Sequence, residues 1–134
     1  MKAFQDLQLP EVLEFRRNEG QIRFHEQRVV ILSAAAMGLL RKELIATLGM
    51  DTARRLLLRF GYADGYHDAV SLRDHFRWED PLDAVRAGPS LHTLEGLVLA
   101  ELTRLEYDRG TRRFEAELAW RHSYEAEQHL LHFG

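Results

Sequence analysis

The chain has 134 residues, a formal net charge of −3, and 18 Lys and Arg against 21 Asp and Glu, with no cysteine. This length allows one domain, and the charge balance disfavours direct binding of nucleic acid. The lack of cysteine excludes disulfide bonds and thiolate zinc sites. No stretch approaches the ~18 apolar residues of a membrane span, and the N-terminus lacks a signal-peptide core, so we expect a cytoplasmic protein without a membrane partner.

Residues 13–24 alternate apolar and polar side chains around a turn, which predicts a β-hairpin with Gly20 at positive φ. From residue 27 to 48 the apolar spacing is helical, and we expect Gly49 to end this helix in the left-handed αL conformation. Residues 33–38 have small side chains that would let another helix come close. That neighbour is either part of the same core or a second subunit.

A second long helix is expected from an N-cap at Asp51 toward Val70. Gly61 and Gly65 are expected to interrupt it. Glycine lowers helix stability by about 1 kcal/mol relative to alanine, so two glycines one turn apart indicate close packing or a hinge.

A short third helix is predicted between Asp80-Pro81 and Gly88-Pro89. Proline fits the first helical position and glycine fits the position after the last one. The chain would leave this helix just before His92, which we expect to lie near its end.

From residue 97 the apolar period falls to two, which predicts strands at about 97–107 and 112–120. The turn between them contains Gly110, which is available for an αL bulge. In the second strand one face is apolar and the other charged, so we expect one dry face and one solvated face. The side chains expected on the dry face are those of Phe114, Ala116, Leu118 and Trp120, and Arg112 precedes them at the same alternate spacing.

Ser123 is the expected N-cap of a C-terminal helix that ends at Phe133-Gly134, with Glu125 and Glu127 in its first turn. Together these elements predict an α+β fold. It has an N-terminal β-hairpin, two long helices, a later antiparallel β-hairpin and a C-terminal helix, and we expect it to form a dimer.

His92 and Trp120 are the candidate ligand-binding residues. A tryptophan ring only donates a hydrogen bond, whereas histidine donates or accepts, so the two together suit a hydroxyl or phenolate oxygen. Burying ~150 Å² of an aromatic ring contributes roughly 4 kcal/mol, and each hydrogen bond adds about 1 kcal/mol. Shape would therefore supply most of the affinity, and the polar groups would select the chemical class.

Structural roles compete with these assignments. A histidine near a helix end is usually structural, and a tryptophan on a dry strand face is usually core. Glu125, His129 and His132 share one helical face as metal ligands do, but a solvated face is favoured because no fourth ligand is evident. An acid–base catalytic role for His25 and Glu26 is disfavoured, because the pair lies in or beside a hairpin with no candidate nucleophile nearby. We expect no catalytic residue, metal or cofactor, and an enzyme acting on a small aromatic substrate is the least favoured hypothesis.

Several linked motifs carry a family resemblance over residues 13–134. They are Glu19-Gly20-x-Ile22, Glu26-Gln27-Arg28, Arg41-Lys42-Glu43-Leu44, Arg59-Phe60-Gly61-Tyr62-Ala63-x-Gly65-x-x-Asp68-Ala69, Gly88-Pro89-x-Leu91-His92-x-Leu94-Glu95-Gly96 and Trp120-x-x-Ser123-Tyr124-Glu125-Ala126-Glu127. The set resembles the N-terminal sensory region of the XylR/DmpR family, bacterial activators of aromatic catabolism that work with the sigma-54 form of RNA polymerase.

The resemblance implies a homodimeric domain that binds a phenol or an alkylbenzene and restrains attached ATPase and DNA-binding domains until it does so. It implies that His92 and Trp120 hold the phenolic oxygen. We assign residues 1–49 to dimerisation and residues 50–134 to the effector pocket. Val85 and Leu118 stand at positions that are aromatic in phenol sensors and would form an aliphatic wall, which Leu102 of the preceding strand completes.

The family's sensory region continues into a vinyl-reductase-like half that contributes pocket aromatic residues and a cysteine-rich zinc site. This sequence has no residues of that half. One alternative is therefore a dimerisation or scaffold half-domain whose pocket is incomplete and which binds no ligand alone.

Overall fold

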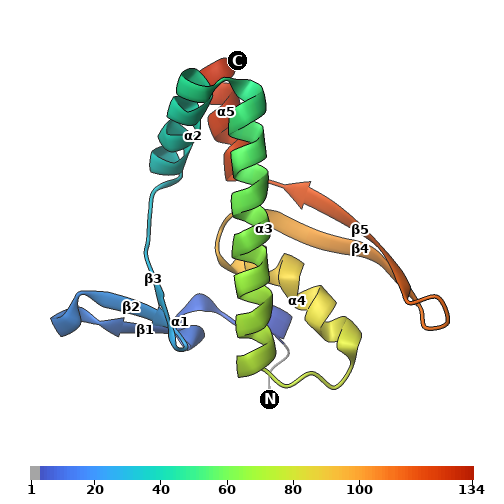
Figure 1. Cartoon of the computed structure of the whole chain (residues 1–134). Helices are drawn as coiled ribbons and strands as arrows, with labels where there is room; N and C mark the ends of the chain where they lie inside the picture. The colour runs from blue at the N-terminus through green and yellow to red at the C-terminus, as the bar shows by residue number, and fades with distance from the viewer. Residues whose placement is uncertain (1–3) are drawn as a thin grey trace.

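The structure is a computed structural model that describes residues 4–134, and its α+β class confirms the prediction. Figure 1 shows a long central helix, with a small sheet near its lower end, two helices near its upper end and a long β-hairpin to one side. In chain order the elements are η1 (Phe4–Asp6), α1 (Leu9–Val12), β1 (Leu13–Arg16), η2 (Arg17–Glu19), β2 (Gln21–Phe24), β3 (Gln27–Val29), α2 (Ala34–Leu48), α3 (Met50–His75), α4 (Pro81–Leu94), β4 (Leu99–Asp108), β5 (Arg113–Arg121) and α5 (Tyr124–Phe133).

The N-terminal hairpin is confirmed, and a third strand joins it. β1 and β2 pair antiparallel, and Gly20 has the αL conformation with φ 62° and ψ 36°. Residues 27–29, which we expected to begin a long helix, form β3, with Val29 paired to Ile22. α2 begins only at Ala34. The correction has a physical reason: β-branched residues follow position 28, and the free edge of β2 offers them hydrogen-bond partners that the helical period does not reveal.

The junction of the two long helices differs from the prediction. Gly49 has φ 75° but ψ 159°, which lies outside the αL region, and it is both the C-cap of α2 and the N-cap of α3. Asp51 therefore lies in the first turn of α3 and not at its cap, where its charge still favours the helix dipole.

α3 runs without interruption through Gly61 and Gly65 and continues past the predicted end to His75. A Cβ added at either glycine would meet nothing within 4 Å, so neither is closely packed in this chain. A helix of 26 residues with continuous hydrogen bonds tolerates two penalties of about 1 kcal/mol each.

α4 also extends beyond its predicted end. Asp80 caps it as expected, because its side chain accepts a hydrogen bond from the Leu82 backbone N–H at 3.0 Å. The helix does not stop at Gly88-Pro89 but continues to Leu94, so His92 lies in its last turn. Proline removes one backbone donor, and the burial of Leu91 against the core keeps the following turn helical.

β4 and β5 form the predicted antiparallel hairpin, with a register shift between Leu102 and Arg104. In its turn the Asp108 side chain accepts a hydrogen bond from the Gly110 backbone N–H at 2.8 Å. The residue with positive φ is Arg112, at 57°, and not Gly110.

The register shift keeps apolar residues on one face of the hairpin, because residues paired across the strands share a face. The pairs on this face are Ala100 with Trp120, Leu102 with Leu118, Leu105 with Ala116 and Tyr107 with Phe114. We call these eight residues the apolar hairpin face. The prediction that the β5 side of this face is dry is wrong for this chain, because both Phe114 and Trp120 are exposed.

The main hydrophobic core lies where α3, α4 and η1 meet. Phe4, Leu72, Ala87 and Leu91 are buried there, and the partly buried side chains packed around them are Leu7, Phe76, Trp78 and Leu94. α5 begins as predicted with Ser123, whose hydroxyl accepts a hydrogen bond from the Ala126 backbone N–H. It packs against α2. Among the helices of residues 4–134, none is both long and apolar enough to cross a membrane.

Candidate functional site

His92 is placed by α4 and held near the start of β4. Its carbonyl accepts a hydrogen bond from the Leu97 backbone N–H at 3.0 Å, and the neighbouring Thr93 hydroxyl accepts one from the Ala100 backbone N–H at 3.0 Å. Ala100 pairs with Trp120 across the hairpin. The end of α4 that carries His92 is thus fixed to the part of the sheet that carries Trp120.

The His92 ring has an acidic neighbour but no hydrogen-bond partner on Nδ1 within the described residues. This nitrogen lies 3.7 Å from Glu95 Oε2, an ion-pair distance when the ring is protonated. Interaction with the Glu95 carboxylate is the main cause that raises the pKa of His92, and Asp68 and Asp64 act in the same direction. Partial burial opposes the shift.

The other four predicted site residues lie on α4 and the apolar hairpin face. Val85 precedes His92 by seven residues, so the two share a face of α4. Leu102 and Leu118 are direct partners across the strands. α4 packs against β4, and Val85 and Leu102 are half-buried, whereas Leu118 is 40% and Trp120 62% exposed. The five positions therefore occupy adjoining elements, with the β5 side open.

A cavity of about 220 Å³ lies between α3 and α4. Of the five predicted residues, only His92 lines it. Its lining residues are Gly65, Asp68, Ala69, Leu72, Arg73, Trp78, Ala84, Gly88, Leu91 and His92.

Two of the residues that line this α3–α4 cavity and carry polar groups, Trp78 and Asp68, were missed by sequence reasoning. Trp78 Nε1 is buried and has no hydrogen-bond partner within the described residues. Burial raises the pKa of Asp68 to about 6, with Glu95 and Asp64 adding to the effect. Little signal for this contact is present in the sequence, because the predicted helices ended near Val70 and Gly88-Pro89, short of the bounds that bring Trp78 and His92 to the cavity.

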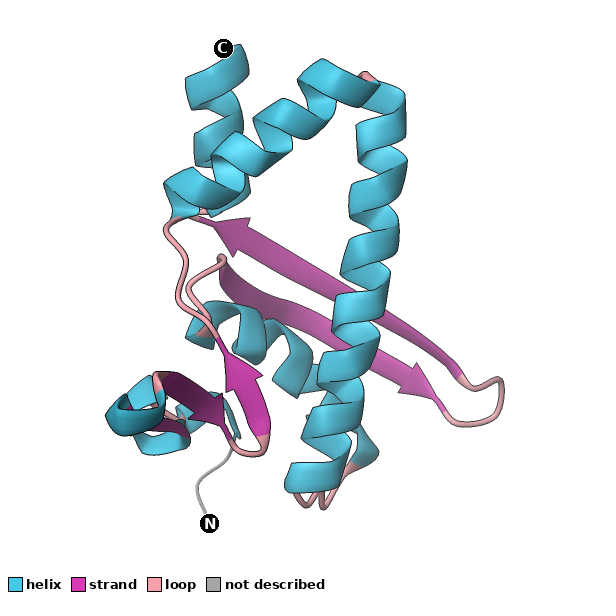
Figure 2. Cartoon of the chain, turned by 60° about the vertical axis from the view of Figure 1, so that its left-hand side comes forward, coloured by secondary structure: helices cyan, strands magenta, loops and turns pink. Residues whose placement is uncertain are grey.

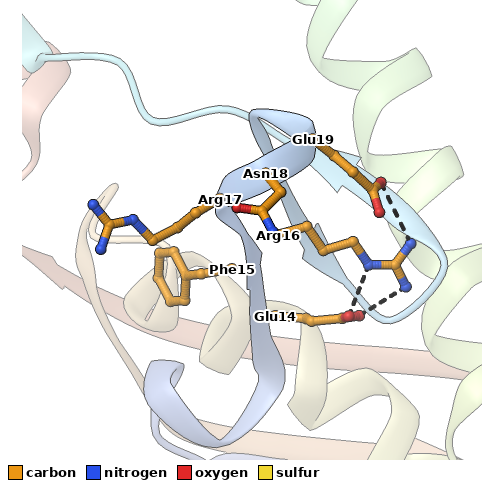
Figure 3. Close-up of a pocket in the computed structure, with 6 residues that line it drawn as sticks. All are labelled: Glu14, Phe15, Arg16, Arg17, Asn18 and Glu19. Carbon is orange, nitrogen blue, oxygen red and sulfur yellow. Dashed lines mark hydrogen bonds and ion pairs between the residues drawn. The ribbon is translucent and has the colours of Figure 1, made fainter.

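A larger, open hollow lies on the N-terminal hairpin. It has a volume of about 570 Å³ and is lined by the consecutive residues 14–19. Figure 3 shows the Arg16 side chain between Glu14 and Glu19. Arg16 Nε lies 2.7 Å from Glu14 Oε1, and Arg16 NH1 lies 3.9 Å from Glu19 Oε2. Because these charges satisfy one another, this hollow offers few free groups to a ligand.

Glu125, His129 and His132 were weighed above as metal ligands. Over the part of the chain that the structure describes, no group of three or more His, Cys, Asp or Glu side chains is arranged to hold a metal ion. The ring of His129 instead lies 5.0 Å from that of Phe133.

A protein family described as activator of aromatic catabolism matches residues 8–108 of this sequence. The chain belongs to this family. Among activators of aromatic catabolism and related regulators, it is 35% identical over 136 residues to the phenol regulator MopR of Acinetobacter guillouiae and 32% identical over 127 residues to the transcriptional regulatory protein XylR of Pseudomonas putida. These matches cover 99% and 92% of this chain.

The fold of this family member matches a solved relative. The crystal structure of the phenol-responsive sensory domain of the transcription activator PoxR with phenol superposes with a TM-score of 0.84 and 36% identity, over 94% of this chain and 63% of that one. The chain spans 23% of MopR and 22% of XylR, so it corresponds to only part of these regulators.

Proposed function

We propose that this chain is an effector-sensing regulatory domain that binds a small aromatic compound of the phenol or alkylbenzene class. The match of its fold to a sensory domain solved with phenol carries this proposal, because it extends over nearly the whole chain. The named relatives are regulators, which supports a role in the recognition of a ligand.

The effector site of this proposal lies between α4 and the apolar hairpin face. His92 and Trp120 hold the oxygen of the effector, and Val85, Leu102 and Leu118 contact its ring. The partly exposed side chain of His92 and the exposed indole of Trp120 support these roles, since a ligand can reach both rings. The raised pKa of His92 increases its protonated share at neutral pH, which favours an oxygen with negative character.

The wider arrangement follows the regulators that the chain resembles. Residues 1–49 dimerise, and residues 50–134 carry the pocket. Effector binding in the cytoplasm then relieves the restraint on an attached sigma-54-dependent ATPase with its DNA-binding domain. Ala34, Ala35 and Ala36 are exposed and suit the dimer contact, because small side chains allow two helices to approach closely. The effector can change the restraint only if it binds the released arrangement more tightly.

A second candidate function is a dimerisation half-domain with an incomplete pocket. The 62% exposure of Trp120 favours it, because an effector held against that ring would keep one side in water. Such a chain would dimerise but bind no aromatic compound until a further segment covered the apolar hairpin face.

A thermal-shift titration separates the two functions. With phenol and toluene at about 100 times Kd, a binding chain gains roughly 2.7 kcal/mol of stability, which raises its melting temperature by several degrees. His92→Ala should remove this rise, whereas Phe114→Ala, at the far end of the same face, should retain it. A dimer that responds to no compound in a broad aromatic panel would support the half-domain instead.

A further inference from the structure

The α3–α4 cavity lies on the side of α4 that faces α3, and it shares His92 with the proposed effector site. Residues 76–80 connect α3 to α4 at the lower end of the molecule in Figure 1, and α4 then crosses the lower part of α3 at an angle. On α3 the lining extends from Gly65 to Arg73, which at 1.5 Å per residue is about 12 Å. Trp78 lies in the connection, and His92 lies toward the end of α4, so these two rings border the cavity from different ends.

The walls of the cavity are small and apolar. Ala69, Leu72, Ala84 and Leu91 supply aliphatic surface. Gly65 contributes no side chain, and a Cβ there would meet no atom within 4 Å. The volume of about 220 Å³ is below the ~300–1,000 Å³ of typical drug-sized pockets, so the space suits a molecule of one ring.

Trp78 and Asp68 are the lining residues whose polar groups could form hydrogen bonds with a ligand. Trp78 Nε1 is a buried donor without a partner in residues 4–134, and leaving such a donor unsatisfied costs roughly 1–3 kcal/mol. Asp68 is a half-buried carboxyl that accepts hydrogen bonds when ionised. Its electrostatic neighbours include the acidic Glu95 and Asp64 and the basic His67 and His92, and Arg73 also lines the cavity. The ionised Asp68 carboxylate itself disfavours an anionic group placed against it.

We propose that the α3–α4 cavity is a second small-molecule site, which takes a neutral one-ring compound with an oxygen substituent at each end. One hydroxyl donates to the Asp68 carboxylate, the other oxygen accepts from Trp78 Nε1, and the ring packs between Leu72 and Leu91. This site goes beyond the proposed effector site because it uses Trp78 and not Trp120. His92 borders both sites, so a ligand in either one would contact the same imidazole.

The two tryptophans make the sites separable by NMR, because each indole N–H gives its own signal in the ¹⁵N-labelled chain. The probe is 4-hydroxybenzyl alcohol, with toluene and the anion 4-hydroxybenzoate for comparison. We expect the alcohol to shift the Trp78 signal saturably; because it is itself a phenol, it also shifts the Trp120 signal where it occupies the proposed effector site. Toluene and 4-hydroxybenzoate should bind at least about tenfold more weakly, a difference of roughly 1.4 kcal/mol.

Gly65→Leu tests the location of binding, and Gly61→Leu is its matched control. Both glycines lie in α3 with open space around them, but only Gly65 lines the cavity. Filling the cavity with Gly65→Leu should weaken binding of the alcohol by about tenfold or more, while Gly61→Leu retains the parent affinity. Circular dichroism of both variants verifies that the helix remains intact.

Equal affinity in Gly65→Leu and the parent would overturn this assignment, as would a Trp78 signal that does not move at probe concentrations up to about 10 mM. A shift confined to the Trp120 signal would place the probe at the effector site and equally reject the second site. Trp120→Phe keeps the two proposals apart, since it should abolish the response to phenol while the Trp78 shift persists.

Discussion

Gly38 of α2 lies against the side chain of Gln128 in α5. A Cβ at position 38 would lie 2.5 Å from Gln128 Oε1 and 2.8 Å from Gln128 Cβ, which is closer than real side-chain atoms approach. Gly38 is buried, whereas Ala34 and Ala35 at the start of the same helix are exposed. The small side chains predicted to admit a neighbouring helix therefore do so within this chain at Gly38.

Replacing Gly38 with alanine should destabilise the chain by about 1–3 kcal/mol, because Gln128 and its helix must shift to admit the methyl group. Urea unfolding would measure the loss. Gly61→Ala is the control: its Cβ meets no neighbour, so it should stabilise the chain by about 0.5–1 kcal/mol through helix propensity alone. If the Gly38→Ala chain were as stable as the parent, α5 and Gln128 would be able to shift away from α2 at little cost in free energy.

Substitutions on the exposed part of the apolar hairpin face should separate binding from stability. Leu118 is 40% exposed, so Leu118→Ser should change the free energy of unfolding by only about 0.5 kcal/mol. The proposed effector site predicts that it nevertheless weakens phenol binding several-fold, measured by calorimetric titration. Phe114→Ser, on the same face at 57% exposure, should leave phenol binding unchanged. Equal effects of the two substitutions on binding would argue against the assigned wall.

Asp68 should make stability depend on pH. Burial raises its pKa from the usual 3.8 to about 6, so the folded chain holds this proton more tightly than the unfolded chain. The resulting stabilisation is complete below pH 3.8 and is lost as the pH rises through about 6. Across this window Asp68→Asn should gain about 1–2 kcal/mol relative to the parent, after allowance for solvent screening.

Urea unfolding at a series of pH values measures this dependence, and Asp74→Asn should change the stability with the opposite dependence on pH. A hydrogen bond from Arg73 lowers the pKa of Asp74, so that carboxylate stabilises the fold above its usual pKa and stops doing so on acidification. A parent and an Asp68→Asn variant with parallel stability curves would mean that the Asp68 carboxyl is solvated.

Pro89 should limit the stability of α4 while orienting its last turn. It cannot donate the backbone hydrogen bond to the carbonyl of Val85, so Pro89→Ala should stabilise the chain by about 1–3 kcal/mol. The same change would alter the orientation of the His92 side chain in the last turn of α4. The rise in melting temperature that phenol produces should therefore become smaller. Pro81→Ala, at the helix start where proline is favourable, should not stabilise the chain. A loss of stability in Pro89→Ala would show instead that the packing of Leu91 requires the proline.

Local chemistry made much of this fold predictable. Asp80 and Ser123 cap their helices through hydrogen bonds to backbone N–H groups two or three residues away, and Gly20 supplies a positive φ within a short turn. The alternation that ends in Leu118 and Trp120 also needs only neighbours along the strand. Such features depend on a few consecutive residues, which is why the α+β class and most elements were predicted.

Tertiary packing decided what those short-range rules could not. Residues 27–29 became a strand because β2 offered them an edge, and α4 continued past Pro89 where Leu91 is buried. The α3–α4 cavity likewise joins Asp68, Trp78 and His92, whose spacing along the chain carries no periodic signal. By itself the sequence determined the helix caps at Asp80 and Ser123, the alternation of the strands and the family. Only the folded chain decided which side chains from different elements meet, because that depends on how whole helices and sheets pack.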